Sequence, residues 1–525
     1  MEPFTRRSFL ADVGRGMLSA GLGAGLALEL DLAPARAGDE PPPLHFGDLE
    51  PLVALLQETP PEKLLPQVVA KLSAGTDLKT LTAAAVFANA RTFGGENYYG
   101  FHVFMALAPA YQMAAELPAA RAALPVLKVL YRNAHYLQEV GGRVHEVLHA
   151  GVVPASTVPP DALRKAVNAG DRATAERLLA ASGKTPADFL NAVLWPVEDN
   201  HDVHSAVLPW RAYSVLDVVG REHAVTLFRQ SVRQCAKSCE GSKGKEAQLD
   251  AARAVVPRLL EKHVLPRAKA GARLADDAWI ERLCETVLAS TPEQAGEAVA
   301  MALAEGFLAE HVGEAISLAA NQLVLRQVEN WEGRNAHGRR THGDSPGVHA
   351  SDATNAWRNM ARVGSPRHQA AGLILAAMDA ARSHGWTQPD KSSGYQKSPY
   401  PRPEDVHKVS ATEAKVLLKE LDGAVRENDQ LRAMALAQTY GSRHHDARPI
   451  FDLLLQYAVS EDGRLHAEKY YRTVREEFET TRPAFRWRQV AALARVTASM
   501  YGFSQQDKQA GRAPGYEEAC RLLRV

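Results

Sequence analysis

The sequence predicts an all-α protein, built as a multi-helix bundle or helix-pair array around a buried His-rich site. Apolar residues recur at three- and four-residue spacing along almost the whole chain beyond residue 48, which is the pattern of amphipathic helices. Runs of alternating β-branched residues are scarce and hairpin turn signals are hard to find, so we do not expect a sheet. In chain order, helices are predicted over Leu49–Leu56, Glu62–Leu72, Leu78–Ala90, Ala119–Val140, Pro160–Ala181, Trp210–Val219, Lys245–Glu261, Asp276–Ser290, Pro292–Leu325, Ala353–Val363, Gln369–Ser383, Thr412–Asn428, Leu431–Tyr440, Ile450–Val459, Leu465–Glu479 and Trp487–Met500.

Local signals support these helices and mark where they are interrupted. The helix near residue 161 begins with an acidic residue, Asp161, and continues with an Ala- and Leu-rich body, as a helix N-terminus does. Two polar segments break the pattern: Asn330–Pro346 is Gly-rich and basic, and Trp386–Pro403 is rich in Pro, Ser, Tyr and Lys. We expect both to be long surface loops, with a candidate domain boundary near residues 386–403.

The composition narrows the classes of function. The chain has 525 residues, and its 61 Lys and Arg residues balance its 61 Asp and Glu residues, which gives no support for nucleic-acid binding. Beyond the N-terminal region, no segment reaches the roughly 18 apolar residues of a membrane span. The four cysteines are too few for a disulfide framework. Cys235 and Cys239 share a helix face, and two ordinary thiols are a better interpretation than a metal-ligand pair.

The first residues carry the pattern of an export signal. Two adjacent arginines, Arg6 and Arg7, precede Phe-Leu, a small and apolar stretch runs from Met17 to Leu28, and Ala35-Arg36-Ala37 resembles a signal-peptidase site. The pattern is typical of a twin-arginine signal peptide, with an ordinary secretory signal as the alternative. The chain would then engage the twin-arginine export machinery, which carries folded proteins, and would be periplasmic or extracellular.

This reading gives a simple domain layout. We expect residues 1–37 to be the signal peptide, residues 38–48 an acidic, Pro-rich linker, and residues 49–525 the all-α part of the chain.

Four histidines share one local setting. His102, His204, His349 and His466 each follow a Gly, Asn or Asp within about one turn, and small and apolar helix formers come after them. Their imidazoles should project from the first turns of four separate helices. A helical bundle builds a metal centre in this way, and neutral imidazole suits zinc, copper and iron. Each histidine alone is more simply a hydrogen-bonded helix-start residue, but the recurrence favours a metal site.

Other side chains could complete this site. His201 and His311 are further candidate ligands. Carboxylates adjacent to the main four could orient the rings, and aromatic side chains could line a substrate pocket, although ordinary core packing explains each aromatic residue equally well. These residues are Asp202, Asp352 and Glu468 among the carboxylates and Tyr98, Phe101, Trp210 and Trp357 among the aromatic residues.

A second pair of histidines offers a competing chemistry. His145-Glu146-Val147-Leu148-His149 matches the H-E-x-x-H pattern of zinc metalloproteases, in which both histidines on one helix face bind zinc and the Glu is the general base. The pattern is short, and no third ligand follows at the usual spacing. A zinc hydrolase is therefore an alternative function.

The His-bearing segments resemble the questin oxidase-like family. The resemblance covers the surroundings of His102, His204 and His349 and the stretch His466-Ala467-Glu468-Lys469, but not the long polar loops. Members of that family are all-α, and some are similar to a non-haem iron oxygenase whose metal is held by several histidines and a carboxylated lysine. The resemblance implies that Lys469 is this lysine, with a solvated surface lysine as the alternative.

The resemblance also implies an activity, namely oxidative cleavage of, or oxygen insertion into, an aromatic, quinone-like small molecule. Fe(II) would be the cofactor, with zinc as the alternative, although family members are not generally exported. A non-catalytic helical binding or scaffold protein is the competing class of function. The metalloenzyme and the scaffold protein predict different structures, because only the metalloenzyme needs the four histidines to converge on one point.

Overall fold

The structure is a computed structural model that describes residues 43–150, 159, 161–200, 202–241, 253–265, 271–327, 343, 345–387, 400–504 and 515–525. Within these residues every element is a helix, and extended residues pair only in two isolated bridges, so the all-α prediction is confirmed. No helix in these ranges is both long and apolar enough to cross a membrane. The predicted signal peptide lies outside the described residues.

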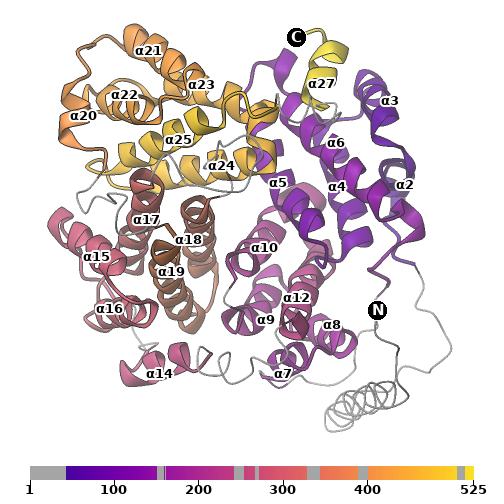
Figure 1. The fold of residues 1–525 in the computed structure, drawn as a ribbon. Coiled ribbons are helices and arrows are strands. Elements are labelled where there is room, and N and C mark those ends of the chain that lie inside the picture. The colour runs from indigo at the N-terminus through magenta and orange to yellow at the C-terminus, as the bar shows by residue number, and fades with distance from the viewer. Residues whose placement is uncertain are drawn as a thin grey trace, which may run out of the picture.

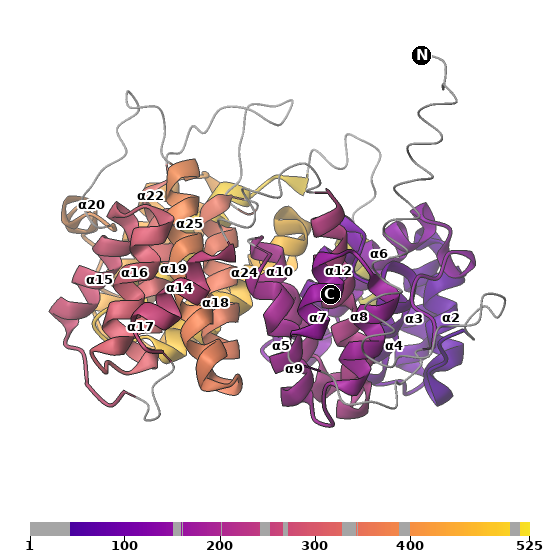
Figure 2. The same cartoon turned by 90° about the horizontal axis from the view of Figure 1, so that it is seen from below.

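The helices form two groups that lie side by side (Figure 1, Figure 2). The first group contains α2 (Glu50–Glu58), α3 (Pro61–Ser73), α4 (Leu78–Phe93), α5 (Tyr98–Ala114), α6 (Leu124–Glu139), α7 (Ala162–Asn168), α8 (Arg172–Ala181), α9 (Pro186–Glu198), α10 (Val203–Ser214), α11 (Leu216–Val219) and α12 (Ala224–Gly241). The second contains α14 (Val255–Lys262), α15 (Asp277–Ala289), α16 (Pro292–Ala304), α17 (Ala309–Arg326), α18 (Pro346–Val363), α19 (Pro366–Thr387), α20 (Pro403–His407), α21 (Ala414–Arg426), α22 (Gln430–Ser442), α23 (Ala447–Val459), α24 (Arg464–Thr480) and α25 (Arg486–Met500).

The end of the chain returns to the first group. The last helix, α27 (Gly515–Leu523), packs against α3 and α6. Short 3₁₀ helices occur at Gly47–Leu49, Ala119–Arg121, Gly142–Val144, Arg221–His223 and Glu461–Gly463.

Four helices join the two groups at the centre of the molecule. Helix α5 packs against α10 and α24, and α18 packs against the same two helices. The four helices therefore form a closed cycle, in the order α5, α10, α18 and α24. Each group contributes two of them, so the contact between the groups is built around this cycle (Figure 2).

Several predicted helices are divided in the structure. The segments predicted as Pro160–Ala181 and Pro292–Leu325 each form two helices, because Gly170 and Gly306 take the left-handed conformation that ends a helix, with φ of 75° and 83°. The segment predicted as Trp210–Val219 comprises the end of α10 and the short α11. Residues 242–252 and most of both predicted polar loops lie outside the described residues.

Five α-helices of the described residues have no counterpart among the predicted periodic segments: α5, α9, α12, α20 and α27, although the setting of His102 did indicate a helix start in α5. The reason is clearest for α5, in which residues 100–110 are buried without interruption. A helix that is covered on every side shows no alternation between an apolar and a polar face, so the periodic signal on which the prediction depends is missing.

Candidate metal centre

The four histidines His102, His204, His349 and His466, called here the four-histidine cluster, lie at the beginnings of the four central helices. They are the fifth residue of α5, the second of α10, the fourth of α18 and the third of α24. Side chains accept hydrogen bonds from first-turn backbone N–H groups at three of these starts: Asn97 on α5, Asp202 on α10 and Ser345 on α18. The predicted helix-start setting is confirmed, and the local sequence fixes where each imidazole leaves the backbone.

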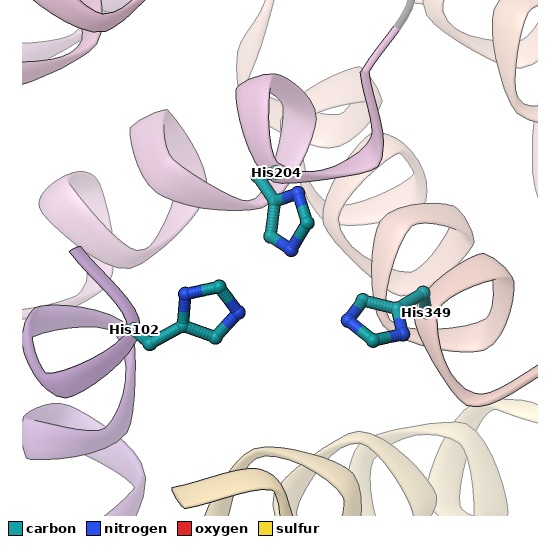
Figure 3. A group of neighbouring side chains, drawn as sticks. All are labelled: His102, His204 and His349. Atoms are coloured by element: carbon teal, nitrogen blue, oxygen red, sulfur yellow. The ribbon is translucent and has the colours of Figure 1, made fainter. Parts of the chain in front are cut away.

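The imidazole rings meet in the same cyclic order as the helices. Ring centroids are 4.8 Å apart for His102 and His204, and 5.2 Å apart for His204 and His349. The cycle closes through His466, whose centroid lies 5.1 Å from that of His349 and 5.4 Å from that of His102. One nitrogen from each of the first three rings lies within 4.8 Å of the other two, and Figure 3 shows these rings around a common centre. This histidine triad could hold a metal ion.

Hydrogen bonds fix the protonation of three rings. The Nδ1 atoms of His102 and His349 lie 2.7 Å and 2.9 Å from the backbone carbonyl oxygens of Tyr98 and Ser345, each four residues earlier. The Nδ1 atom of His204 lies 2.7 Å from Oδ1 of Asp202. Because a carbonyl or carboxylate oxygen only accepts, each Nδ1 must carry the proton. In the neutral rings, the lone pairs that could bind a metal are therefore on Nε2.

The Nε2 atoms of all four rings are buried and have no hydrogen-bond partner. A buried polar atom without a partner costs about 1–3 kcal/mol, so four such atoms together are a considerable cost to folding. A cation at the histidine triad would satisfy the Nε2 lone pairs of His102, His204 and His349 together, and the ring of His466 lies beside them. The donor set of the cluster therefore fits a metal ion with imidazole ligands.

Burial keeps the rings of His102, His349 and His466 neutral, as metal binding requires. Burial, followed by the field of Lys469, holds the pKa values of His102 and His466 well below the usual range. Burial and the neighbouring His204 lower the pKa of His349 to about 4. Lone pairs on these rings are thus available near neutral pH.

The three predicted orienting carboxylates differ in what they bind. Asp202 contacts the ring of His204, as predicted. Asp352 instead accepts from Nη2 of Arg211 at 2.8 Å, and Glu468 forms an ion pair with Lys128 at 2.7 Å. Neither of these two is recorded in a hydrogen bond with a histidine of the cluster. Asp352 lies about one helical turn beyond His349 and bonds to a neighbouring helix, whereas Glu468 lies about 200° around the helix from His466, so nearness in sequence placed neither carboxylate against a ring.

Lys469 is buried beside the cluster and is not a surface lysine, since it is 3% exposed. The positive charge of its amine contributes to the lowered pKa values of His102, His349 and His466. Burial lowers the pKa of its amine to about 8; Arg211 acts in the same direction, and the carboxylates of Asp352 and Glu468 oppose the shift.

Of the remaining predicted ligands, His311 is not in the cluster. His311 lies on α17, and its Nδ1 accepts a hydrogen bond from the backbone N–H of Ala275 at 3.0 Å. Its ring is not in the group of neighbouring metal-ligand atoms found among the described residues. His201 lies outside those residues.

The alternative zinc motif lacks its helix. Helix α6 ends at Glu139, and His145 to His149 follow a 3₁₀ turn in a non-helical segment. Glu146 forms an ion pair with Arg91 at 3.0 Å. The prediction of two ligands on one helix face is wrong here, because the glycines at 141 and 142 take positive φ and end the helical path.

Aromatic rings cover one side of the cluster. The ring of Tyr98 lies 4.4 Å from that of His102 and 5.7 Å from that of His204, and Phe101 contacts the same two imidazoles. Tyr98 is 56% exposed, so it stands between these two imidazoles and solvent. Trp210 stacks on Tyr213 instead and lines a separate cavity of about 190 Å³.

Sequence reasoning did not single out Arg211 and Thr473. Arg211 is 2% exposed, and together with Thr473 it contacts Asp352 beneath the rings. Their seven-residue spacing from His204 and His466 could have signalled them, because residues seven apart lie on one helix face. Comparisons with known protein families, with curated proteins and with solved structures found no match.

Proposed function

We propose that this chain is a non-haem iron oxygenase that acts on an aromatic or quinone-like small molecule. The observation that carries the proposal is the set of four buried Nε2 atoms that have no hydrogen-bond partner at the meeting point of four helices. The four-histidine cluster would hold the metal, and Lys469 would be a fifth ligand in carboxylated form. The resemblance to the questin oxidase-like family supports both assignments.

The number of donors favours iron over zinc. Structural zinc is commonly tetrahedral and bound by cysteines, and catalytic zinc usually has three protein ligands. Four imidazoles and one oxygen donor suit a metal of higher coordination number, with one position left open. When bound there, ferrous iron supplies the one-electron chemistry through which dioxygen reacts with an organic substrate.

The charges around the rings explain why Lys469 would act as an anion. Asp202 and Asp352 are negative, and Arg211 and Lys469 are positive, so these four side chains cancel. A divalent cation would leave two positive charges in a buried site, which is very costly. The N-termini of four helices add positive potential. Converting Lys469 from an ammonium group to a carbamate removes both excess charges.

The other residues of the site have supporting roles in this proposal. The oxygen atoms that accept hydrogen bonds from Nδ1 of His102, His204 and His349 keep Nε2 of each ring directed at the metal. Tyr98 and Phe101 exclude water from one side and offer aromatic surfaces to a planar substrate. A scaffold protein would leave four buried Nε2 atoms without a partner, and a zinc hydrolase built on Glu146 would have to break its ion pair with Arg91.

Metal analysis tests the proposal. We expect near-stoichiometric iron in the wild-type chain and in His311→Ala, and loss of iron in His349→Ala. Oxygen uptake should then be measured with a panel of hydroxylated naphthoquinones and anthraquinones. Iron that survives His349→Ala would refute the site, and zinc that disappears only in His145→Ala would favour the hydrolase.

We further propose that residues 1–37 direct export of the folded chain by the twin-arginine route. An Arg6→Lys, Arg7→Lys double variant should then accumulate in the cytoplasm with its signal uncleaved. Export of the double variant at the wild-type level would contradict this.

A further inference from the structure

A polar layer lies one to two helical turns beyond the four-histidine cluster, along three of its four helices. Three of the ligand helices each place one polar side chain there: Arg211 on α10, Asp352 on α18 and Thr473 on α24. Oδ1 of Asp352 accepts hydrogen bonds from Nη2 of Arg211 at 2.8 Å and from Oγ1 of Thr473 at 2.9 Å. Both charged side chains are almost fully buried, at 2% and 9% exposed. The layer is therefore a fixed part of the core.

Arg211 has an unused donor in this layer. Its guanidinium carries five N–H groups, and its Nε atom is buried without any acceptor. Removing such a donor from water without a partner is unfavourable by about 1–3 kcal/mol. An oxygen acceptor beside Nε would remove this cost.

Lys469 faces the same layer. It is four residues before Thr473 on α24, a spacing that puts the two side chains on one face of the helix. The charges of Arg211 and Asp352 both shift the pKa of its amine, which Arg211 lowers and Asp352 raises. The neighbouring carboxylate of Glu468 is already paired with Lys128. Arg211 and Lys469 are thus two buried cations beside one carboxylate, and the layer lacks an anion.

We propose that Arg211 is a positioning residue that binds the carbamate of Lys469, with Nε–H donating to one carbamate oxygen while Nη2 stays on Asp352. The inference rests on the proposed function, because it assumes that Lys469 is the carboxylated ligand. One carbamate oxygen would then be held by Arg211, and the other would be left for the metal. The guanidinium both neutralises the carbamate and sets its orientation.

Carboxylation of Lys469 requires CO₂ and water only, and neither an enzyme nor an oxidant. The ammonium group of Lys469 first loses a proton to water. The Nζ lone pair then forms a bond to the carbon of CO₂, one C–O π pair moves onto oxygen, and the second proton leaves Nζ for water. The product is a carbamate with one negative charge. Arg211 stabilises this product and not the free amine, whose positive form it repels.

Carbon NMR tests the assignment without relying on activity. The full-length protein, supplied with iron-free zinc to avoid paramagnetic broadening, is equilibrated with ¹³C-bicarbonate. The carbamate signal is identified by its absence in Lys469→Met. We expect Arg211→Gln and Arg211→Lys each to reduce its occupancy at low bicarbonate about tenfold, as loss of a group that orients a metal ligand does. Excess bicarbonate should restore the signal in Arg211→Lys.

The matched control is Arg229→Gln. Arg229 is another buried arginine, 6% exposed, and its Nε donates to Glu176 at 2.6 Å on a different pair of helices. The Arg229→Gln substitution should leave the carbamate signal unchanged. This control separates a local role of Arg211 from a general loss of stability. Circular dichroism confirms folding, and Arg211→Lys keeps the test open if Arg211→Gln does not fold.

The outcomes separate the two proposals. A full carbamate signal in both Arg211 variants would overturn the role of Arg211 and leave the carboxylated ligand intact. A wild-type chain that binds metal but gives no Lys469-dependent signal would overturn the ligand role of Lys469 and, with it, this inference. A chain that binds no metal would refute the proposed function itself.

Discussion

The bond between Asp202 and His204 offers a sharp test of the metal centre. Oδ1 of Asp202 accepts from Nδ1 of the ring and from the backbone N–H of His204, both at 2.7 Å. An Asp202→Asn variant keeps an oxygen in the same position and remains a good N-cap, so α10 should stay intact. What it loses is the negative charge behind the ring.

The magnitude follows from the lost charge. A hydrogen bond to an ionised group is roughly twice as strong as a neutral one, so the change removes about 1 kcal/mol of support for the ring. Outer-shell substitutions of this kind lower metal affinity by about 10–100-fold. We expect Asp202→Asn to weaken metal affinity about tenfold, near the lower end of this range, because the ring keeps a hydrogen-bond acceptor.

The measurement is a competition titration of the protein against a chelator of known affinity. Asp171→Asn is the matched control, because Asp171 caps α8 by accepting from the N–H of Thr174 at 3.0 Å and does so without a histidine. The reasoning is refuted if Asp202→Asn binds metal within twofold of the wild type. An equal loss in Asp171→Asn would also refute it, because the effect would then be one of helix stability.

Three further outcomes are expected. Protein held at a free-ion concentration of a hundred times Kd should lose about 2.7 kcal/mol of its free energy of unfolding when the metal is chelated. In calorimetry, the stability of His349→Ala should not depend on the metal. Lys128→Met should cost about 3–5 kcal/mol in urea unfolding, because it strands the fully buried carboxylate of Glu468, and adding Glu468→Leu should recover most of the loss. Burial raises the pKa of Asp379 from 3.8 to about 6, and Arg382 opposes this only in part. The folded state therefore favours the protonated acid. The free energy of unfolding should fall by about 2 kcal/mol at this site as pH rises from 4 to 7. An Asp379→Asn variant compared across that range should lack this component.

Local sequence patterns were sufficient for the helical class and for the helix-start positions of the four histidines. The residues before His204 and His349 are helix-start residues whose effect is confined to one turn, so the placement of those rings at helix N-termini could be predicted without tertiary information. The same reasoning found Asp202, whose bond to the ring is also local.

What could not be predicted depends on long-range packing. The cycle of rings forms only because α5 contacts α24, from opposite ends of the chain, and no pattern within either helix encodes that contact. The periodic pattern missed the body of helix α5, whose start was indicated only by the setting of His102, because burial on all sides removes the amphipathic period. The partners of Asp352 and Glu468 likewise come from other helices, Arg211 on α10 and Lys128 on α6.

The cyclic arrangement of ligands has a consequence for biosynthesis. His102 emerges from the ribosome early, but the cycle closes only when His466 on α24 is available. At a synthesis rate of roughly 5–20 residues per second, about twenty seconds to one minute separate these two events. During that interval the nascent chain carries unpaired imidazoles that belong to an unfinished site. If the cluster binds a metal ion, its full set of four imidazoles is available only after nearly the whole polypeptide has been made.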